Sequence, residues 1–201
     1  AVQPRIHQLA RDPYVLASLG PDASNNLRVT EQFLMAGLNK FSSPMRGQLI
    51  STIKKQRVDI FGGDLSYGRI HDPLLILEQS NIHYQPATQN YQDAAGIYRS
   101  SRINLNISSL QFDSAVNNRV FDIALSGGFF LTDKRSDLES VFPFATEISY
   151  QTPEEMCEKI NYWSDSSLNR KYLEVKDELW KICSKRNTYQ NAVSTIFEKI
   201  N

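Results

Sequence analysis

The sequence predicts an α/β protein, with one parallel sheet of about six strands and helices on both of its faces. Short apolar runs of strand length alternate with amphipathic, helix-like segments along most of the chain. Two glycine pairs, Gly62-Gly63 and Gly127-Gly128, fall between successive elements, where a chain turns sharply. The chain has 201 residues, 41% of them hydrophobic, which is enough for one large domain or two small ones with a real core.

Each expected strand is followed by a loop and a helix before the next strand begins. The expected strands are Phe33–Leu38, Val58–Phe61, Ile82–Gln85, Ile103–Ile107, Phe129–Thr132 and Glu147–Tyr150. Helices are expected after Ser43-Pro44, at Pro73–Gln79, at Tyr91–Ser100, from Val116, after the capping-box pattern of Thr152 and Glu155, and after Leu168 with a break near Asn187. The strand Ile103–Ile107 has a near-continuous apolar run, so we expect it in the centre of the sheet. Residues 1–31 are expected to be a linker, and residues 32–201 to form the domain.

Composition argues against several classes of protein. The chain carries 22 basic and 22 acidic residues, so no net field favours nucleic acid or an acidic membrane. No apolar run approaches about 18 residues and no signal-peptide pattern is present, which predicts a soluble, cytoplasmic protein without a membrane span. The cysteines and histidines show no metal-ligand spacing, so we expect no metal. The chain begins at Ala1 without an initiator Met, which is expected of a fragment of a longer protein.

The stretch 101–133 forms the central β-loop-α-β unit of the predicted fold. In such a unit, ligands bind at the carboxyl end of the first strand and at the N-terminus of the helix, where backbone N–H groups point outward. The polar residues Asn118, Arg119 and Asp122 share one face of the helix, opposite its apolar stripe. The dinucleotide fingerprint, the P-loop and Asp-x-Asp patterns are all absent, which argues against a dehydrogenase, an NTPase and a metal-held pyrophosphate.

The residues of this unit resemble the nucleotide-sugar-binding domain of the spore-maturation-protein-like (CgeB-like) glycosyltransferases. The matching positions are Leu105-Asn106, Asn117-Asn118-Arg119, Phe121-Asp122, Gly127-Gly128, Leu131-Thr132-Asp133 and Leu138-Glu139 with Phe142. Asp122 stands where the family usually has Glu, which keeps the charge and shortens the reach. In the C-terminal part, Asn187-Thr188-Tyr189 keeps two of three residues of the family's His-Thr-Tyr, and Ala192 replaces the Arg that follows it.

The resemblance implies a GT-B architecture, in which two Rossmann-like domains face each other across a cleft and the C-terminal one holds the donor. This chain then corresponds to the Rossmann-like donor domain, and the acceptor-binding N-terminal domain is missing. The donor is a nucleoside-diphosphate sugar, which is a substrate, and no further cofactor is expected. The catalytic residues remain unknown, and the isolated domain is expected to be inactive alone.

The chemistry of such a donor suits the residue types independently of the family. Its pyrophosphate needs cations and helix N-terminal N–H groups, and its ribose diol needs a carboxylate acceptor. Arg46 and Arg119 can supply the cations, and Asp122 the carboxylate. The expected donor-binding residues are Asn39, Arg46, Gly62, Asn106, Asn118, Arg119 and Asp122.

Each of these residues also has a plainer interpretation. Arg119 and Asp122 can form an ordinary solvated ion pair, and a helix-start arginine such as Arg46 is common on protein surfaces. Gly62-Gly63 suits a plain turn as well as a backbone approach to a base or sugar, and Gly127-Gly128 suits a helix C-cap better than a phosphate loop. The alternative function is a noncatalytic α/β interaction module, in which large side chains fill the crevice.

Overall fold

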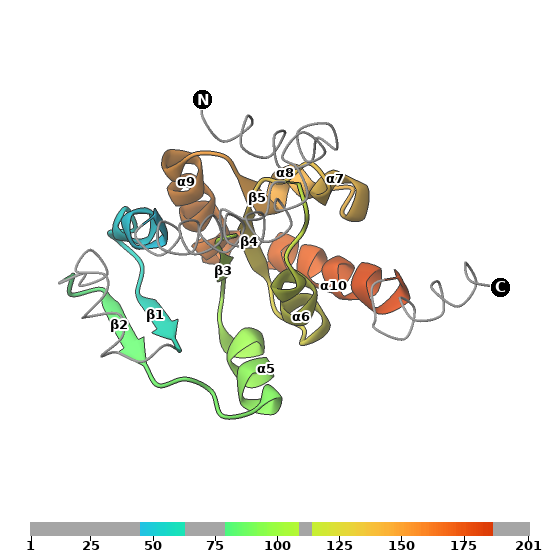
Figure 1. Ribbon diagram of the computed structural model, residues 1–201. Coiled ribbons are helices and arrows are strands. Elements are labelled where there is room, and N and C mark those ends of the chain that lie inside the picture. The colour runs from blue at the N-terminus through green and yellow to red at the C-terminus, as the bar shows by residue number, and fades with distance from the viewer. Residues whose placement is uncertain (1–44, 63–78, 109–113, 187–201) are drawn as a thin grey trace, which may run out of the picture.

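The computed structural model describes residues 45–62, 79–108 and 114–186, in which five strands are interspersed with helices (Figure 1). A helical segment at 45–51 comes first. It is followed by β1 (Val58–Phe61), β2 (Ile82–Gln85), α5 (Tyr91–Ser100), β3 (Asn104–Asn106), α6 (Asn118–Leu125), β4 (Phe130–Asp133), α7 (Leu138–Val141), α8 (Ala145–Ile148), β5 (Ser149–Tyr150), α9 (Pro153–Ser164), the 3-10 turn η2 (Ser166–Leu168) and α10 (Asn169–Arg186).

All described strand pairs are parallel, which confirms the predicted α/β class. Strand β1 pairs with β2, and β4 lies between β3 and β5, with Leu105 opposite Leu131 and Thr132 opposite Ser149. Five of the six expected strands are present. The sixth, Phe33–Leu38, lies outside the described residues, as do the linker 1–31, residues 73–78 of an expected helix, and the C-terminal stretch after Arg186.

The prediction of one six-stranded sheet with Ile103–Ile107 at its centre is wrong. The described strands form two sheets, β1-β2 and β3-β4-β5, and β3 lies at an edge of the second. Val58 of β1 and Leu105 of β3 meet in one apolar cluster through their side chains, without strand pairing between them. An apolar run identifies a strand, but side-chain burial alone does not specify which backbones form hydrogen bonds.

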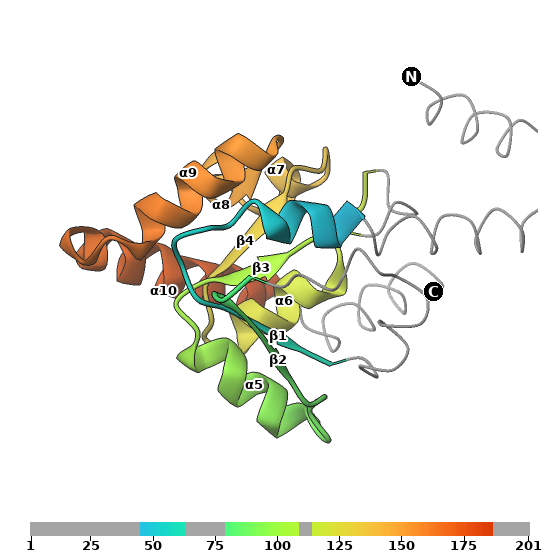
Figure 2. The ribbon, with the colours of Figure 1, turned by 90° about the vertical axis from the view of Figure 1, so that its left-hand side faces the viewer.

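Strand β4 occupies the central position of the β3-β4-β5 sheet, and its apolar run is fully buried. Phe130 joins a cluster with α6, α9 and α10, and Leu131 joins a second cluster on the opposite face with α9 and Ile53. Both side chains have no exposed surface. Figure 2 shows the corresponding layers, with α9 and the helical segment 45–51 above the sheet and α6 below it. Helices therefore cover both faces of this sheet, as predicted.

Three aromatic rings hold the larger cluster together. The Phe129 ring lies 5.0 Å from the Trp163 ring and 5.1 Å from the Tyr172 ring, centroid to centroid. The predicted buried positions of α9, Met156, Ile160 and Trp163, are buried as expected. Thr152 caps α9 by accepting a hydrogen bond from the Glu155 backbone N–H. Helices α9 and α10 are thereby fixed against the sheet.

The glycine pair after α6 ends the helix, which confirms the C-cap interpretation. Gly127 has φ +74°, a left-handed conformation that favours glycine. A Cβ atom on Gly128 would lie 2.6 Å from the backbone oxygen of Tyr98. The first glycine therefore allows the turn, and the second allows the chain to pass close to α5.

The expected strand Glu147–Tyr150 is shorter than predicted. Glu147 and Ile148 belong to α8, and only Ser149 and Tyr150 form strand β5. Side chains take the carbonyl groups that a strand neighbour would otherwise use, since the Trp163 indole N–H donates to the Glu147 carbonyl and Lys159 donates to the Ser149 carbonyl. Within the described segments, none of the helices is both long and apolar enough to cross a bilayer.

Candidate functional site

The candidate site lies where the parallel strands β3, β4 and β5 end, because the carboxyl ends of parallel strands meet at one edge of a sheet. An open cavity of about 610 Å³ occupies this edge, between the helical segment 45–51 and the start of α9. Its lining residues are Met45, Gln48, Leu49, Thr52, Ile107, Asp133, Lys134, Arg135, Tyr150, Gln151, Thr152 and Pro153. This cavity is called the strand-end cavity below.

Arg46 lies beside the strand-end cavity, and its pKa is shifted by its surroundings. Its Nε donates a hydrogen bond to the carbonyl oxygen of Ile107 at 3.2 Å. Partial burial lowers the pKa of Arg46, the positive charge of Arg119 lowers it further, and the negative charge of Asp133 opposes them. Two arginines from distant parts of the sequence therefore lie close enough to repel each other.

Arg119 is exposed in the first turn of α6, which begins at the N-cap Asn117. The Asn117 side chain accepts a hydrogen bond from the Arg119 backbone N–H at 3.0 Å. Asp122 lies one turn further along and is partly buried. Within the described part of the chain these two side chains form no ion pair with each other, so the simple surface pair expected under the plainer interpretation is not observed.

Asn106 is completely buried and belongs to a polar network beneath the strand ends. Its Nδ2 donates to Thr132 Oγ1 at 2.9 Å, and its backbone carbonyl accepts a hydrogen bond from the Tyr150 hydroxyl at 3.3 Å. Its Oδ1 is buried without a hydrogen-bond partner among the described residues. Burial raises the pKa of Tyr150, with Asp133 adding to the effect, so this phenol stays protonated and remains a donor. The network joins the ends of β3, β4 and β5.

Asp133 and Arg135 are site residues that the sequence prediction missed. Asp133 Oδ1 accepts the Ser108 backbone N–H at 2.8 Å, and its Oδ2 lies 2.7 Å from Arg135 Nε. The peptide group between Ile107 and Ser108 is therefore held on both sides, by Arg46 at its oxygen and by Asp133 at its nitrogen. The signal was present in the sequence, because Asp133 ends the Leu-Thr-Asp pattern at the carboxyl end of a buried strand.

The remaining predicted residues are not brought to the strand-end cavity by the described structure. Gly62 follows β1 in the two-stranded sheet and has φ +97°, with open space where a Cβ would lie. Asn118 is the exposed first residue of α6. Asn39 lies outside the described residues.

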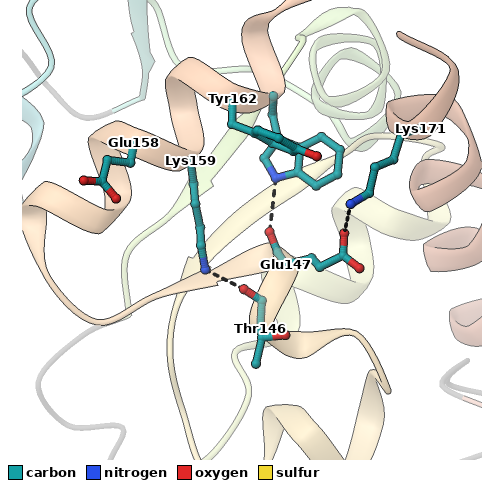
Figure 3. A pocket seen from close by; sticks show the side chains of 7 residues that line it. Thr146, Glu147, Glu158, Lys159, Tyr162 and Lys171 are labelled. Atoms are coloured by element: carbon teal, nitrogen blue, oxygen red, sulfur yellow. Dashed lines mark hydrogen bonds and ion pairs between the residues drawn. The ribbon is translucent and has the colours of Figure 1, made fainter. Parts of the chain in front are cut away.

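A second cavity, of about 410 Å³, lies between α8, α9 and α10 (Figure 3). Two of its charged groups form an ion pair, in which Lys171 Nζ lies 2.7 Å from Glu147 Oε2, and a third, Lys159, pairs with Glu155 on the same helix. Hydrogen bonding to Glu147, and then to Tyr162, raises the pKa of Lys171. The Lys171–Glu147 ion pair joins α10 to α8, and the Trp163 indole N–H donates to the Glu147 carbonyl, so we assign this cavity a structural role in holding α8, α9 and α10 together.

Parallel strands with helices on both faces define the α/β class, in which the carboxyl ends of the strands are the usual place for a ligand. A family model described as glycosyl transferase-like matches residues 46–198, which is most of the chain. The chain therefore belongs to this glycosyl transferase-like family. No curated protein and no solved structure matches it. The glycosyltransferase resemblance of the sequence is confirmed at this level, and the narrower CgeB-like group stays a prediction.

Proposed function

We propose that this domain binds a nucleoside-diphosphate sugar, the donor of a glycosyl transfer reaction, at the carboxyl ends of β3 and β4. Arg46 and Arg119 contact the pyrophosphate, and Asp122 accepts hydrogen bonds from the ribose hydroxyls. The observation that carries the proposal is the position of Arg46 at the strand ends, held by its hydrogen bond to the Ile107 carbonyl, where partial burial and then the positive charge of Arg119 lower its pKa. Two neighbouring cations repel each other when the site is empty, and a dianionic pyrophosphate between them removes that repulsion.

The backbone supports the same assignment. Helix α6 has eight residues and begins beside Arg119, so its first N–H groups and the positive end of its dipole add to the arginine charges. Hydrogen bonds between guanidinium groups and phosphate oxygens are charge-assisted and can be bidentate. Asn106, which is fully buried, acts by fixing the strand ends beneath the ligand. Asn39, Gly62 and Asn118 complete the predicted set of donor contacts.

The proposal places the chain in the CgeB-like group, as the donor half of a GT-B enzyme that works in the cytoplasm. Transfer also requires an acceptor site and the exclusion of water, which we assign to a second, N-terminal domain. This 201-residue chain is then expected to bind the donor without transferring its sugar at a meaningful rate. Robust transfer to a defined acceptor by this chain alone would refute the two-domain account.

Calorimetric titration with uridine, guanosine and adenosine diphosphates tests the proposed site. Arg119→Ala is expected to weaken binding by about 1.5–3 kcal/mol, the range for hydrogen bonds to charged groups, with little change in folding. Asp122→Asn is expected to weaken ribonucleotide binding and to spare inorganic pyrophosphate, which has no ribose. Arg170→Ala is the matched control, because Arg170 is an exposed arginine on α10.

The interaction-module alternative predicts the opposite results. In that case no nucleoside diphosphate binds the wild-type protein, or binding is equal in wild type and in both variants. The open cavity at the strand ends and the lack of an ion pair between Arg119 and Asp122, both described residues, support the donor site over the module, for which a filled crevice and a paired Arg119 were expected.

A further inference from the structure

The strand-end cavity lies next to the proposed pyrophosphate site. Met45 lines it, next to Arg46, and so does Ile107, whose carbonyl accepts the Arg46 hydrogen bond. Its volume of about 610 Å³ falls within the range of about 300–1,000 Å³ typical of small-molecule sites. A group attached to a pyrophosphate at Arg46 can therefore enter this cavity.

Most of the cavity wall is uncharged. One set of lining side chains is apolar or aromatic, and a second set carries neutral amide or hydroxyl groups. The first set is Met45, Leu49, Ile107, Tyr150 and Pro153, and the second is Gln48, Thr52, Gln151 and Thr152. Apolar walls with a few neutral hydrogen-bonding groups match a sugar ring, which has apolar C–H faces and hydroxyl groups around its edge.

The three charged lining residues are already engaged in ion pairs. Asp133 Oδ2 lies 2.7 Å from Arg135 Nε, and Lys134 Nζ lies 3.0 Å from Glu139 Oε1. Asp133 and Arg135 are both largely shielded from solvent, with side chains 18% and 21% exposed. A carboxylate brought into the cavity would meet the like charge of Asp133 and compete with it for Arg135, which is unfavourable at a partly desolvated site.

We propose that the strand-end cavity holds the sugar of the donor and selects an uncharged sugar over an acidic one. This inference rests on the proposed donor-binding function and adds the chemical class of the sugar. The neutral amides and hydroxyls of the wall bind the sugar hydroxyls, and Asp133 accepts a hydrogen bond from one of them while its charge excludes a uronic acid.

Titration of the whole chain with matched nucleotides tests whether the cavity prefers an uncharged sugar to an acidic one. The probes are UDP, UDP-glucose and UDP-glucuronic acid, together with GDP, GDP-mannose and GDP-mannuronic acid. The neutral sugar nucleotide of the series that binds is expected to bind at least about tenfold more tightly than its acidic counterpart. Asp133→Asn is expected to narrow this gap, because it removes the like charge and keeps an acceptor for the Ser108 N–H.

A steric variant tests the location independently of Asp133. Gln48 is exposed on the helical segment 45–51, so Gln48→Trp fills part of the cavity without entering the core. It is expected to weaken sugar-nucleotide binding at least about fivefold more than it weakens binding of the free diphosphate. Lys54→Trp is the matched control, because Lys54 is exposed and lies outside the cavity lining. Thermal unfolding of each variant confirms that the protein is folded.

The outcomes separate this inference from the function on which it rests. Equal or tighter binding of the acidic sugar, or a Gln48→Trp effect that is equal for the diphosphate and its sugar ester, overturns the inference. If Arg119→Ala still weakens diphosphate binding, the proposed function survives that result. Failure of the wild-type chain to bind any nucleotide in the panel overturns both.

Discussion

The two described sheets differ sharply in burial. In β4, Phe130 and Leu131 are enclosed on opposite faces by α6, α9 and α10. In β1, half-buried and exposed residues alternate, and Phe61 is 44% exposed. A two-stranded sheet is marginal without packing partners. The strand-end cavity is lined by Asp133 of β4, Tyr150 of β5 and Ile107 just after β3, so it lies on the better-packed sheet, which suits a site whose geometry must be held rigidly.

The largest effect expected from this comparison is the loss of a core aromatic beside β4. Phe129→Ala should destabilise the protein by about 3–5 kcal/mol, because it leaves a cavity between Trp163 and Tyr172. Val58→Ala in β1 should cost about 1 kcal/mol or less, since Val58 is only partly buried. Urea unfolding of both variants measures the difference. Equal losses would mean that the two sheets are equally well packed.

Arg102 joins the start of β3 to α9 and α10, and its removal should have the next largest effect. Its guanidinium donates to the Trp163 carbonyl at 2.8 Å and to Asn169 Oδ1 at 2.7 Å, and it stacks 3.7 Å from the Tyr172 ring centroid. Arg102→Ala should cost about 1.5–3 kcal/mol in urea unfolding.

Arg102→Lys should fail to restore this stability, because a lysine ammonium cannot make the same planar stack and directed hydrogen bonds. Full recovery with lysine would show that charge alone matters at this position. If Arg102→Ala and the exposed control Arg170→Ala lower the free energy of unfolding by the same amount, the contacts described for Arg102 are contradicted.

The glycines on either side of β3 should respond in opposite directions. Gly128→Ala should destabilise by about 1–3 kcal/mol, because its Cβ would lie 2.6 Å from the Tyr98 backbone oxygen. Gly96 lies within α5 with open space around it, so Gly96→Ala should stabilise by about 0.4–1 kcal/mol. Thermal unfolding distinguishes a stabilising from a destabilising change. An unchanged stability in Gly128→Ala would mean that the α5 backbone moves away from the new Cβ at little cost.

Apolar periodicity and end signals were sufficient to predict five strands, the parallel pairing, the C-terminal end of α6 and the N-cap of α9. The start of α6 was predicted too early, because Val116 precedes the N-cap Asn117. The same signals could not predict which strands pair, because Val58 and Leu105 can share a cluster without a backbone hydrogen bond. The boundary of β5 also escaped prediction, since it depends on side chains of α9, Lys159 and Trp163, that take the carbonyl groups of Ser149 and Glu147. Tertiary contacts decide such features.

The candidate site likewise combines residues that the sequence could predict with contacts that only the fold brings about. Arg46 and Arg119 could be proposed from their positions at helix starts, and their mutual approach follows from the fold. The ion pair between Asp133 and Arg135 was not predicted, because Arg135 lies in a loop after a strand, where no periodic pattern applies. The hydrogen bond from the Tyr150 hydroxyl to the Asn106 carbonyl was not predicted either, because it joins two strands that are distant in the sequence. Residues at the carboxyl ends of buried strands should therefore be weighed as site candidates even without a named motif.

The central claim is that Arg46 and Arg119 form one anion site, and a binding comparison of the two arginines tests it most directly. Calorimetric titration of wild type, Arg46→Ala, Arg119→Ala and the double variant with a nucleoside diphosphate gives the affinities. Each single variant is predicted to lose about tenfold or more in affinity, and the double variant to lose measurable binding, because both cations contact the same pyrophosphate. Arg46→Ala or Arg119→Ala binding as tightly as wild type, in a protein that remains folded, would contradict the account.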